Sequence, residues 1–513
     1  MDAQELKKYL ADNEIDVQSA RAGFGAADWV FRAYSESVKA IGVEHNHVHC
    51  YFGPGADVFY QLISRDDIKK SSQKIYEDYL ENPDSLENKI RAQRGLMEEM
   101  ERLGLEYSGR PGAEMPDMEF LGYFKQIIDL GYEWWQYAVI GEDKAEVVDW
   151  EVVPRFQKRH GIIYEEAREA VSILAHPDEM AVFNQEHKKF LGICLAVCEE
   201  MEADGKNDFA LAWKNEKIQG LVGEYLAEFF WMRTNFYETV RITPEMLMDD
   251  VRKEIEAKSK DGIKEEISNI DSNFARIRDK KREMRDAYVL TEEDRIDIEF
   301  SQAVIAWFDQ RKSDMMRQFY YIYAMMQEIS ARKKIDYHTC TLYFMEELFD
   351  LLEKNKQVDP AIIAKRENGV FLAFEQGQRI IYSGAEAEEM FDLIMKNNRR
   401  DVLRGVVASR GGQEKIRGTV NIVIRPDKNH FQEGKILVTS MTRIEFVPLM
   451  KKARAIITNE GGLACHAAIV SRELGLPAII STKNATQVLQ DGDEIEMDLK
   501  TGEIKVITAI SAA

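Results

Sequence analysis

The chain has 513 residues, which is enough for three or four domains with cores of their own. A hydrophobic fraction of 45% and a charged fraction of 31% exclude wholesale disorder. The 68 basic and 90 acidic residues give a net charge of −22, which argues against nonspecific binding to nucleic acid or to anionic lipid.

The sequence favours a cytoplasmic protein. No stretch approaches the roughly 18 consecutive apolar residues of a membrane span, and the N-terminus MDAQELKKYLADNEID has no apolar signal-peptide region. The cysteines are odd in number and include no CxxC pair, so they suggest no disulfide framework and fit a reducing compartment. They are Cys50, Cys194, Cys198, Cys340 and Cys465.

Residues 1–65 are predicted to form a small mixed α/β segment, because VHCYFGPGADVFYQLI has the pattern of a strand, a Gly-Pro-Gly turn and a second strand. His45, His47 and His49 alternate just before and within this segment. On a strand they would share one face, which makes them weak candidates for a zinc site. The alternative is a polar strand face without metal, and we expect no metal here because no fourth ligand is identifiable.

Residues 66–365 are predicted to form a mostly helical module, in which apolar residues recur at three- and four-residue spacing. The pattern is clearest at 221–240 and 298–334, and Thr291 with Asp294 could cap the second helix. The charged stretch 258–286 is typical of a solvated helical arm. Cysteines and aromatic residues on these helices are expected mainly in the core, although one aromatic face could line an acceptor pocket. These residues are Cys194, Cys198, Trp134, Trp135, Tyr137, Phe319, Tyr320, Tyr321 and Tyr323.

The character of the sequence changes after residue 365. Residues 366–400 are predicted to form a hairpin with Gln376-Gly377 near its turn, a short helix and a linker at 397–404. Residues 401–513 are richer in strands and end in a hairpin around Lys500-Thr501-Gly502. The expected fold is therefore a large helical N-terminal module followed by a separate C-terminal α/β domain.

The chemistry is concentrated in ARAIITNEGGLACHAAIVSRELGLPAII, from Ala453 to Ile480. An apolar strand leads into Gly461 and Gly462, and then into a helix that begins near His466 and ends at Gly475. Glycines let the backbone approach a phosphate closely, and the free N–H groups of a helix N-terminus favour an anion. The same N-terminus keeps an imidazole neutral, so His466 could accept a phosphoryl group as a nucleophile. The alternative for an isolated histidine is a role in helix capping or packing.

The region from about Arg404 to Val506 resembles the phosphohistidine swivelling (mobile) domain of phosphoenolpyruvate-utilising enzymes, a family that includes phosphoenolpyruvate synthase, pyruvate phosphate dikinase and rifampin phosphotransferase. The resemblance is carried by GKILVTSMTRIEFVPLMKKARAIITNEGG, CHAAIVSRELGLPAIISTKNAT and LQDGDEIEMDLKTGEIKV. It implies that His466 is the phosphorylated residue, and that Gly461, Gly462, Cys465 and Arg472 bind the phosphate.

The chain departs from the family pattern in three places. Ala464 replaces a threonine that is a regulatory target in some members, Thr442-Arg443-Ile444 replaces the usual Thr-x-Pro, and Ser481-Thr482-Lys483 replaces a small turn. None of these changes removes the nucleophile.

The helical module shows neither an ATP-grasp pattern nor a TIM barrel. More weakly, it resembles the acceptor-binding region of rifampin phosphotransferase, in a long helix with Arg311 followed by LYFMEELFDLL and KRENGVFLAFEQGQRIIYSG.

The resemblance implies a phosphotransferase, or a subunit of one, in which His466 carries a phosphoryl group between two partners. The donor would be a separate ATP-grasp or nucleotide-binding chain that uses ATP with magnesium, or phosphoenolpyruvate, so we expect no cofactor on this chain. The acceptor would be a small molecule in the helical module, with Arg472 and Arg454 as candidate cations and Arg443 as a poorer one. The alternative is a binding or regulatory protein that keeps the swivelling fold as a docking module.

Overall fold

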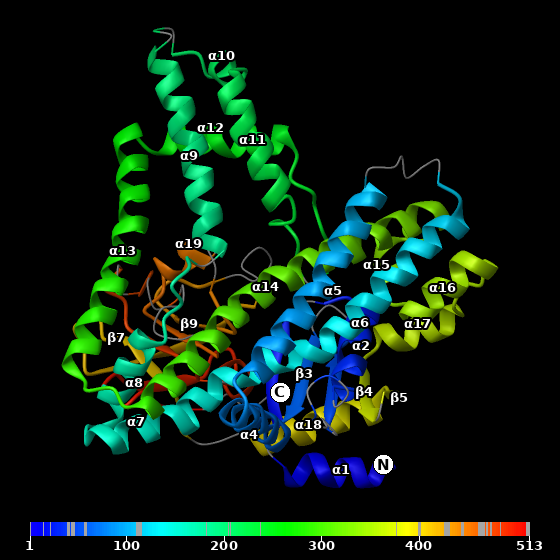
Figure 1. Cartoon of the computed structure of the whole chain (residues 1–513). Helices are drawn as coiled ribbons and strands as arrows, with labels where there is room; N and C mark the ends of the chain where they lie inside the picture. The colour runs from blue at the N-terminus through cyan, green and yellow to red at the C-terminus, as the bar shows by residue number, and fades with distance from the viewer. Residues whose placement is uncertain are drawn as a thin grey trace. The chain divides into compact units, whose positions relative to one another are not determined.

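The computed structural model describes most of the chain (Figure 1). The described residues are 2–13, 15–20, 22–37, 40, 42, 47–55, 59–108, 115–180, 182–203, 205, 207–235, 237–375, 377–398, 402–424, 431–442, 446–459, 467, 470–471, 474–482 and 484–508. The chain separates into two compact units. The sheet unit comprises 1–31, 46–67 and 359–513, and the helical unit comprises 32–45 and 68–358.

Within the described residues of the sheet unit, strands form one five-stranded and one eight-stranded sheet. The five-stranded sheet is antiparallel in the order β1-β3-β2-β4-β5. Its strands are β1 (Ile15–Ala20), β2 (Val48–Phe52), β3 (Phe59–Ser64), β4 (Val370–Glu375) and β5 (Gln378–Ser383). The β4–β5 hairpin confirms the prediction for 366–384. Its partner β2 comes from the N-terminal segment, so this sheet is assembled from two distant parts of the chain.

Helices complete the core of the five-stranded sheet. Helix α1 (Ala3–Asp12) packs against α18 (Ala385–Asn398), and α18 packs on β4 and β5. Leu6 and Leu10 of α1 join Phe371 of β4 in one apolar cluster. Two further helices of this unit are α2 (Phe24–Ser35), which continues into the helical unit, and α17 (Pro360–Glu367). Asp28 of α2 is buried and pairs with the Arg379 guanidinium of β5.

The helical unit confirms the predicted helical character of 66–365. In chain order its helices are α4 (Arg65–Glu81), α5 (Asp84–Ser108), α6 (Asp117–Val147), the π-helical segment η2 (Val148–Val152), α7 (Val153–His160), α8 (Tyr164–Leu174), α9 (Val182–Ala203), α10 (Phe209–Trp213), α11 (Glu216–Phe229), α12 (Pro244–Ala257), α13 (Lys260–Ala287), α14 (Glu292–Lys333), α15 (Tyr337–Thr341) and α16 (Met345–Lys354). Helices α5, α6 and α14 pack on one another, and α9 packs against α11, α12 and α13 (Figure 1).

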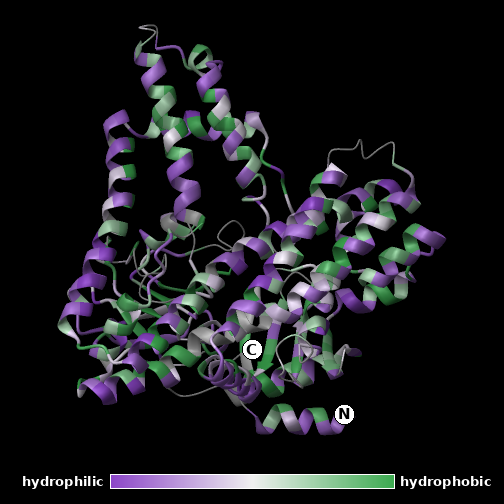
Figure 2. Cartoon of the chain, in the orientation of Figure 1, coloured by the Kyte–Doolittle hydropathy of each residue, from purple (hydrophilic) through white to green (hydrophobic). Residues whose placement is uncertain are grey.

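Two sequence expectations in this unit need correction. The helix expected over 221–240 ends at Phe229, where the backbone passes into turns in which the Met232 N–H donates to the Phe229 carbonyl and the Thr234 N–H to the Trp231 carbonyl. The charged stretch expected as a solvated arm is α13, which is largely hydrophilic (Figure 2) but packs one face on α9 and buries Ile263 completely.

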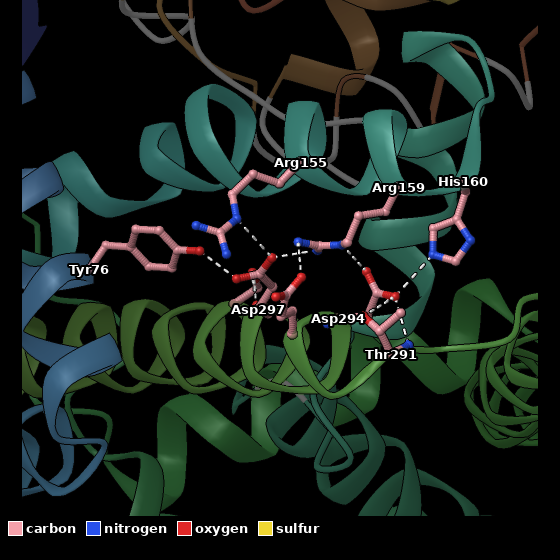
Figure 3. A network of polar contacts seen from close by, with 9 residues as sticks. Tyr76, Arg155, Arg159, His160, Thr291, Asp294 and Asp297 are labelled. Carbon is pink, nitrogen blue, oxygen red and sulfur yellow. Dashed lines mark hydrogen bonds and ion pairs between the residues drawn. The ribbon is translucent and has the colours of Figure 1, made fainter.

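The N-terminus of α14 is held by a buried polar network (Figure 3). Thr291 and Asp294 form the predicted capping box, which confirms the sequence assignment. The Arg159 guanidinium of α7 contacts both Asp294, at 2.7 Å from Nε to Oδ1, and Asp297, at 2.6 Å from Nη2 to Oδ2. Asp297 also accepts a hydrogen bond from the Tyr76 hydroxyl of α4. The carboxylates of Asp294 and Asp297 on α14 thus join this helix to α7 and α4.

The eight-stranded sheet has the order β6-β13-β12-β8-β9-β10-β11-β7. Its strands are β6 (Val402–Arg404), β7 (Val406–Ser409), β8 (Lys415–Ile422), β9 (Ile436–Thr439), β10 (Ala455–Thr458), β11 (Ala478–Ile480), β12 (Glu494–Asp498) and β13 (Glu503–Thr508). Strands β8, β9, β10 and β11 are parallel, and the flanking pairs are antiparallel. The β12–β13 hairpin confirms the predicted turn at 500–502. Two short helices, α19 (Val447–Met450) and α21 (Ala485–Val488), accompany the sheet.

Both faces of this sheet are covered, which explains the continuous apolar runs in its sequence. Alternate residues enter two separate cores, as Ile436 and Val438 do on one side of β9 and Leu437 does on the other. The end strands β6 and β7 are joined through Gly405 alone, so the two edges of the sheet meet at this residue. The C-terminal region is thus an α/β domain that follows a large helical region, as expected.

Candidate functional site

The predicted nucleophile follows β10, one of the two inner strands of the parallel group. This strand is fully buried and ends at Thr458, and its neighbours β9 and β11 run parallel to it. The carboxyl ends of parallel strands lie at the same edge of a sheet, where loops commonly carry functional residues. The Thr458 carbonyl accepts hydrogen bonds from Thr482, at 3.0 Å from the backbone N and 2.8 Å from Oγ1, so the connections after β10 and β11 are tied together.

The next residue, Asn459, is held by hydrogen bonds of both its side chain and its backbone. Its side chain is 3% exposed. Its Oδ1 accepts from the Thr486 N–H at 2.9 Å, and its Nδ2 donates to Thr486 Oγ1 at 2.6 Å and to Gln487 Oε1 at 3.2 Å. Its backbone N–H donates to the Thr439 carbonyl at 3.1 Å. Asn459 was not singled out from the sequence, although its place between a buried strand and Gly461 was a usable signal.

The predicted site residues themselves lie outside the described part of the chain. They are Gly461, Gly462, Cys465, His466 and Arg472, and the candidate cation Arg443 lies outside it as well. Their roles therefore remain predictions. Arg454 is described, and it is exposed just before β10, at the opposite end of that strand from Asn459. This position makes Arg454 a poor candidate for contact with a phosphate on His466.

The structure describes the chain again immediately after His466. Ala467 is helical and buried in the apolar core that also contains Ile456. The end of this helix confirms the sequence prediction, since Gly475 has a backbone φ of 62° and the Leu476 N–H donates to the Ser471 carbonyl at 2.8 Å. This is the arrangement of a Schellman C-cap, which favours glycine. The described residues on either side of His466, Asn459 and Ala467, are thus both buried and held in the fold.

The N-terminal histidines do not assemble a metal site within the described residues. His45 lies outside them, His47 precedes β2, and His49 lies within β2. No group of three potential metal ligands occurs in the described parts of the chain. His47 stacks on Tyr9 with ring centroids 3.8 Å apart. Burial lowers the pKa of His49 to about 3, so this imidazole is neutral at physiological pH.

Most of the other residues singled out from the sequence are core residues. Cys194 and Cys198 belong to the apolar core of α9–α13, as expected, and burial raises the pKa of both thiols. Cys50 and Cys340 are also buried free thiols. Of the aromatic residues singled out on α6 and α14, Tyr137 is partly buried, and the others are buried; these are Trp134, Trp135, Phe319, Tyr320, Tyr321 and Tyr323.

Polar side chains are buried among these aromatic residues in the helical unit. Arg311 and Gln318 lie seven residues apart on α14, and therefore on one face of the helix. Gln318 is fully buried, and neither its Oε1 nor its Nε2 has a hydrogen-bond partner among the described residues. The Nε1 of Trp134, also fully buried, has none either. On α5, the Gln93 side chain bridges the Trp134 carbonyl and the Trp307 Nε1. Gln318 was not evident from the sequence, where it is one polar residue in a long amphipathic helix.

Comparison with known proteins assigns the C-terminal part of the chain. The family model "PEP-utilising enzyme, mobile domain" matches residues 431–502, a range that contains His466. Residues 431–502 form a PEP-utilising enzyme mobile domain. His466, which the resemblance implies is the phosphorylated residue, follows β10 within this range.

Several phosphoenolpyruvate synthases match the same part of the chain. A probable phosphoenolpyruvate synthase of Staphylothermus marinus is 44% identical over 116 residues, 22% of this chain and 14% of that protein. A probable phosphoenolpyruvate synthase of Archaeoglobus fulgidus is 48% identical over 102 residues, 20% of this chain and 13% of that protein. The phosphoenolpyruvate synthase of Pseudomonas aeruginosa is 36% identical over 138 residues, 27% of this chain and 17% of that protein.

The similarity therefore spans less than a fifth of the length of these relatives, and it supports a role in phosphoryl transfer. In the described part of the chain, no helix combines the length and the apolar character needed to cross a membrane.

Proposed function

We propose that the protein is a phosphotransferase component in which His466 carries a phosphoryl group from a separate donor chain to an acceptor. The observation that carries this proposal is the mobile-domain match over 431–502, together with an intact histidine after Gly461 and Gly462. Two anchors support it, since Asn459 and Ala467 hold the chain on either side of the segment with His466.

The chemistry consists of two displacements at phosphorus. A neutral imidazole nitrogen of His466 attacks the donor phosphoryl group with its lone pair, forming a P–N bond while the P–O bond to the donor breaks. An acceptor oxygen then attacks the same phosphorus and the P–N bond breaks. The acceptor hydroxyl gives up its proton as the electron pair returns to the imidazole. The donor would be an ATP-grasp or nucleotide-binding chain that uses ATP with magnesium, or a chain that uses phosphoenolpyruvate.

We place the acceptor in the helical unit, near Gln318. A fully buried carboxamide without partners is costly, by about 1–3 kcal/mol for each unpaired group, unless a bound molecule supplies the hydrogen bonds. Gln318 offers a donor and an acceptor, and Arg311 adds a cation seven residues away on the same face of α14. These groups suit a small polar molecule with an oxygen that can receive the phosphoryl group. This is also the region that resembles the acceptor-binding part of rifampin phosphotransferase.

The experiment uses the full chain recovered from its native cells under alkaline conditions. Phosphohistidine is stable to alkali and labile to acid, so phosphopeptide mass spectrometry distinguishes it from a serine ester. We expect the phosphoryl group on His466, and we expect its loss in His466→Ala, in which alanine preserves the helix. Absence of the modification under conditions that preserve phosphohistidine, or a label on another residue, would refute the carrier role.

The acceptor is tested separately on chain that is phosphorylated at His466. Release of the phosphoryl group is measured with a panel of small hydroxyl compounds. Release that depends on one compound, and that is lost in Gln318→Leu, supports the acceptor site. Release that is equal in wild type and Gln318→Leu contradicts it.

The second candidate is a binding or regulatory protein that uses the mobile domain for docking. The intact His466 motif argues against it, because docking alone does not require a nucleophile. A His466→Ala chain that retains its full biological activity would favour this alternative.

A further inference from the structure

Gln487 of α21 links the mobile domain to the five-stranded sheet, and both of these parts belong to the sheet unit. Its Oε1 accepts a hydrogen bond from Asn459 Nδ2 of the mobile domain at 3.2 Å. Its Nε2 donates to the Val17 carbonyl of β1 at 3.4 Å. The Gln487 side chain is buried, and one carboxamide thus bridges two parts of the fold that lie far apart in the sequence.

The apolar residues in and directly after α21 face the core of their own domain. Ala485, Val488 and Leu489 all belong to the apolar core of the eight-stranded sheet. Among the described residues, the core that contains Phe371 of the five-stranded sheet shares no member with it. The link that Gln487 makes between the two parts is polar, so it can be released without opening either core.

Strand β1 is an edge strand. Among the described strands of its sheet it stands at one end of the order and pairs with β3 on one side. In an antiparallel pair, alternate residues direct their backbone N–H and C=O groups away from the partner strand. Such an open edge can pair with another chain, and folded proteins commonly cover it. Gln487 supplies a donor to one of these outward carbonyls, that of Val17, and α21 also packs against α18 of the same sheet layer.

We propose that α21 is a docking element, through which the mobile domain binds reversibly to the open edge of β1, and that the hydrogen bond from Gln487 to the Val17 carbonyl is its specific contact. The inference goes beyond the proposed function and does not rest on it. A neutral hydrogen bond longer than the usual range of about 2.7–3.2 Å is weak, which suits a contact that opens and closes. In the docked position the mobile domain protects β1, and its departure exposes this edge.

The variant Gln487→Glu separates the two hydrogen bonds of this side chain. An ionised glutamate at pH 8 can still accept from Asn459 Nδ2, but it has no hydrogen to give to the Val17 carbonyl. Thr486→Val is the matched control on the same helix. It removes the hydroxyl that accepts from Asn459 Nδ2, and it leaves the contact between Gln487 and Val17 in place.

Docking is measured by amide hydrogen exchange of the full chain, followed by mass spectrometry of its peptides. We expect exchange in β1, residues 15–20, to be about threefold faster or more in Gln487→Glu than in wild type, because an uncovered edge strand opens more often. Exchange in β1 should be unchanged in Thr486→Val. Peptides that contain β9 and β10 report on the core of the mobile domain, and they should exchange as in wild type in both variants.

Unchanged exchange of β1 in Gln487→Glu would overturn the proposal, even if α21 itself exchanged faster, because Gln487 would then act only within its own domain. Equal acceleration of β1 in Gln487→Glu and Thr486→Val would also overturn it, since the effect would follow from the bonds of Asn459. If fast exchange of β9 and β10 shows that Gln487→Glu is unfolded, Gln487→Met decides by the same criteria, because methionine has a similar length and donates no hydrogen bond. None of these outcomes depends on phosphorylation of His466, so this inference and the proposed function fail separately.

Discussion

Removal of the Arg159 guanidinium should destabilise the helical unit strongly. This guanidinium contacts two carboxylates whose side chains are at most 1% exposed, those of Asp294 and Asp297 (Figure 3). In Arg159→Met the aliphatic stem remains, but both buried carboxylates lose a cation. Breaking a buried ion pair by removing one partner typically costs about 3–5 kcal/mol.

The contacts that Asp294 and Asp297 keep in Arg159→Met limit the loss of stability. Asp297 keeps the Tyr76 hydroxyl and the Arg155 guanidinium, with Arg155 Nε at 3.4 Å from Oδ2. Asp294 keeps Thr291 and His160, with His160 Nε2 at 3.1 Å from Oδ2. Two charged hydrogen bonds are lost at about 1.5–3 kcal/mol each, or about 3–6 kcal/mol together. Because both carboxylates keep other partners, we expect a loss of about 3–5 kcal/mol in the free energy of unfolding.

The assay is urea unfolding followed by tryptophan fluorescence. Trp29 lies in the sheet unit, whereas the remaining tryptophans lie within 68–358, so the signal reports mainly on the helical unit. With an m-value of about 3 kcal/mol/M, the midpoint should fall by about 1–1.7 M. Arg102→Met is the control, because Arg102 pairs with Glu99 on the exposed face of α5, where solvent screens the pair, so the midpoint should stay close to that of wild type.

The pH dependence of the stability difference between wild type and Arg159→Met is a second test of this prediction. Burial raises the pKa of Asp294, but the hydrogen bonds from Thr291 and the Arg159 guanidinium outweigh it, so the pKa lies below its ordinary value. The stability from this group is present above the unfolded pKa, about 3.9, and is lost as the pH falls through the folded pKa. The difference between wild type and Arg159→Met should therefore shrink below about pH 4. A loss within 1 kcal/mol at pH 7, or one no larger than that of Arg102→Met, would refute this reasoning.

Three further outcomes are expected. Gly502→Ala should destabilise the mobile domain in thermal unfolding far more than Gly412→Ala. A Cβ at Gly502 would lie 2.0 Å from the Gly405 carbonyl oxygen, whereas a Cβ at Gly412, which also has a positive φ, would meet open space. Similar losses of stability in the two variants would contradict this. The fragment 401–513 should fold alone, because both cores of its sheet are drawn from these residues; a circular dichroism spectrum without a cooperative melt would contradict it. Burial raises the pKa of Asp314 to about 6, so this group destabilises the fold progressively as the pH rises above about 4. Asp314→Asn should therefore stabilise the helical unit at pH 8 by about 2 kcal/mol and have little effect at pH 4.5. Equal effects at the two pH values would refute this.

The features that the sequence predicted correctly are local. The hairpin at Val370, the cap at Thr291 and the helix end at Gly475 depend on residues a few positions apart, whose conformational preferences can be read directly. The mobile domain was recognisable because its motif is long and contiguous. In each case the decisive partners are close in the chain.

The features that the sequence did not predict depend on distant partners. The pairing of β2 with β4 joins Val48 to Phe374, and strand patterns do not specify which strand will be the neighbour. Asn459 and Thr486 are 27 residues apart, so the amide clamp is visible only in three dimensions. The Phe229 helix end was missed because apolar periodicity continues beyond it, while the backbone turns that follow it are visible only in the structure.

The assembly of the five-stranded sheet from two distant parts of the chain has a consequence for biosynthesis. Strand β3 ends at Ser64 and β4 begins at Val370, so about 300 residues must be translated before β2 can receive its second neighbour. At about 5–20 residues per second this takes roughly 15–60 s. During that time the fully buried strand β2 has an unpaired edge, which is a surface prone to aggregation. Completion of the N-terminal sheet therefore depends on a strand that leaves the ribosome long after the first three.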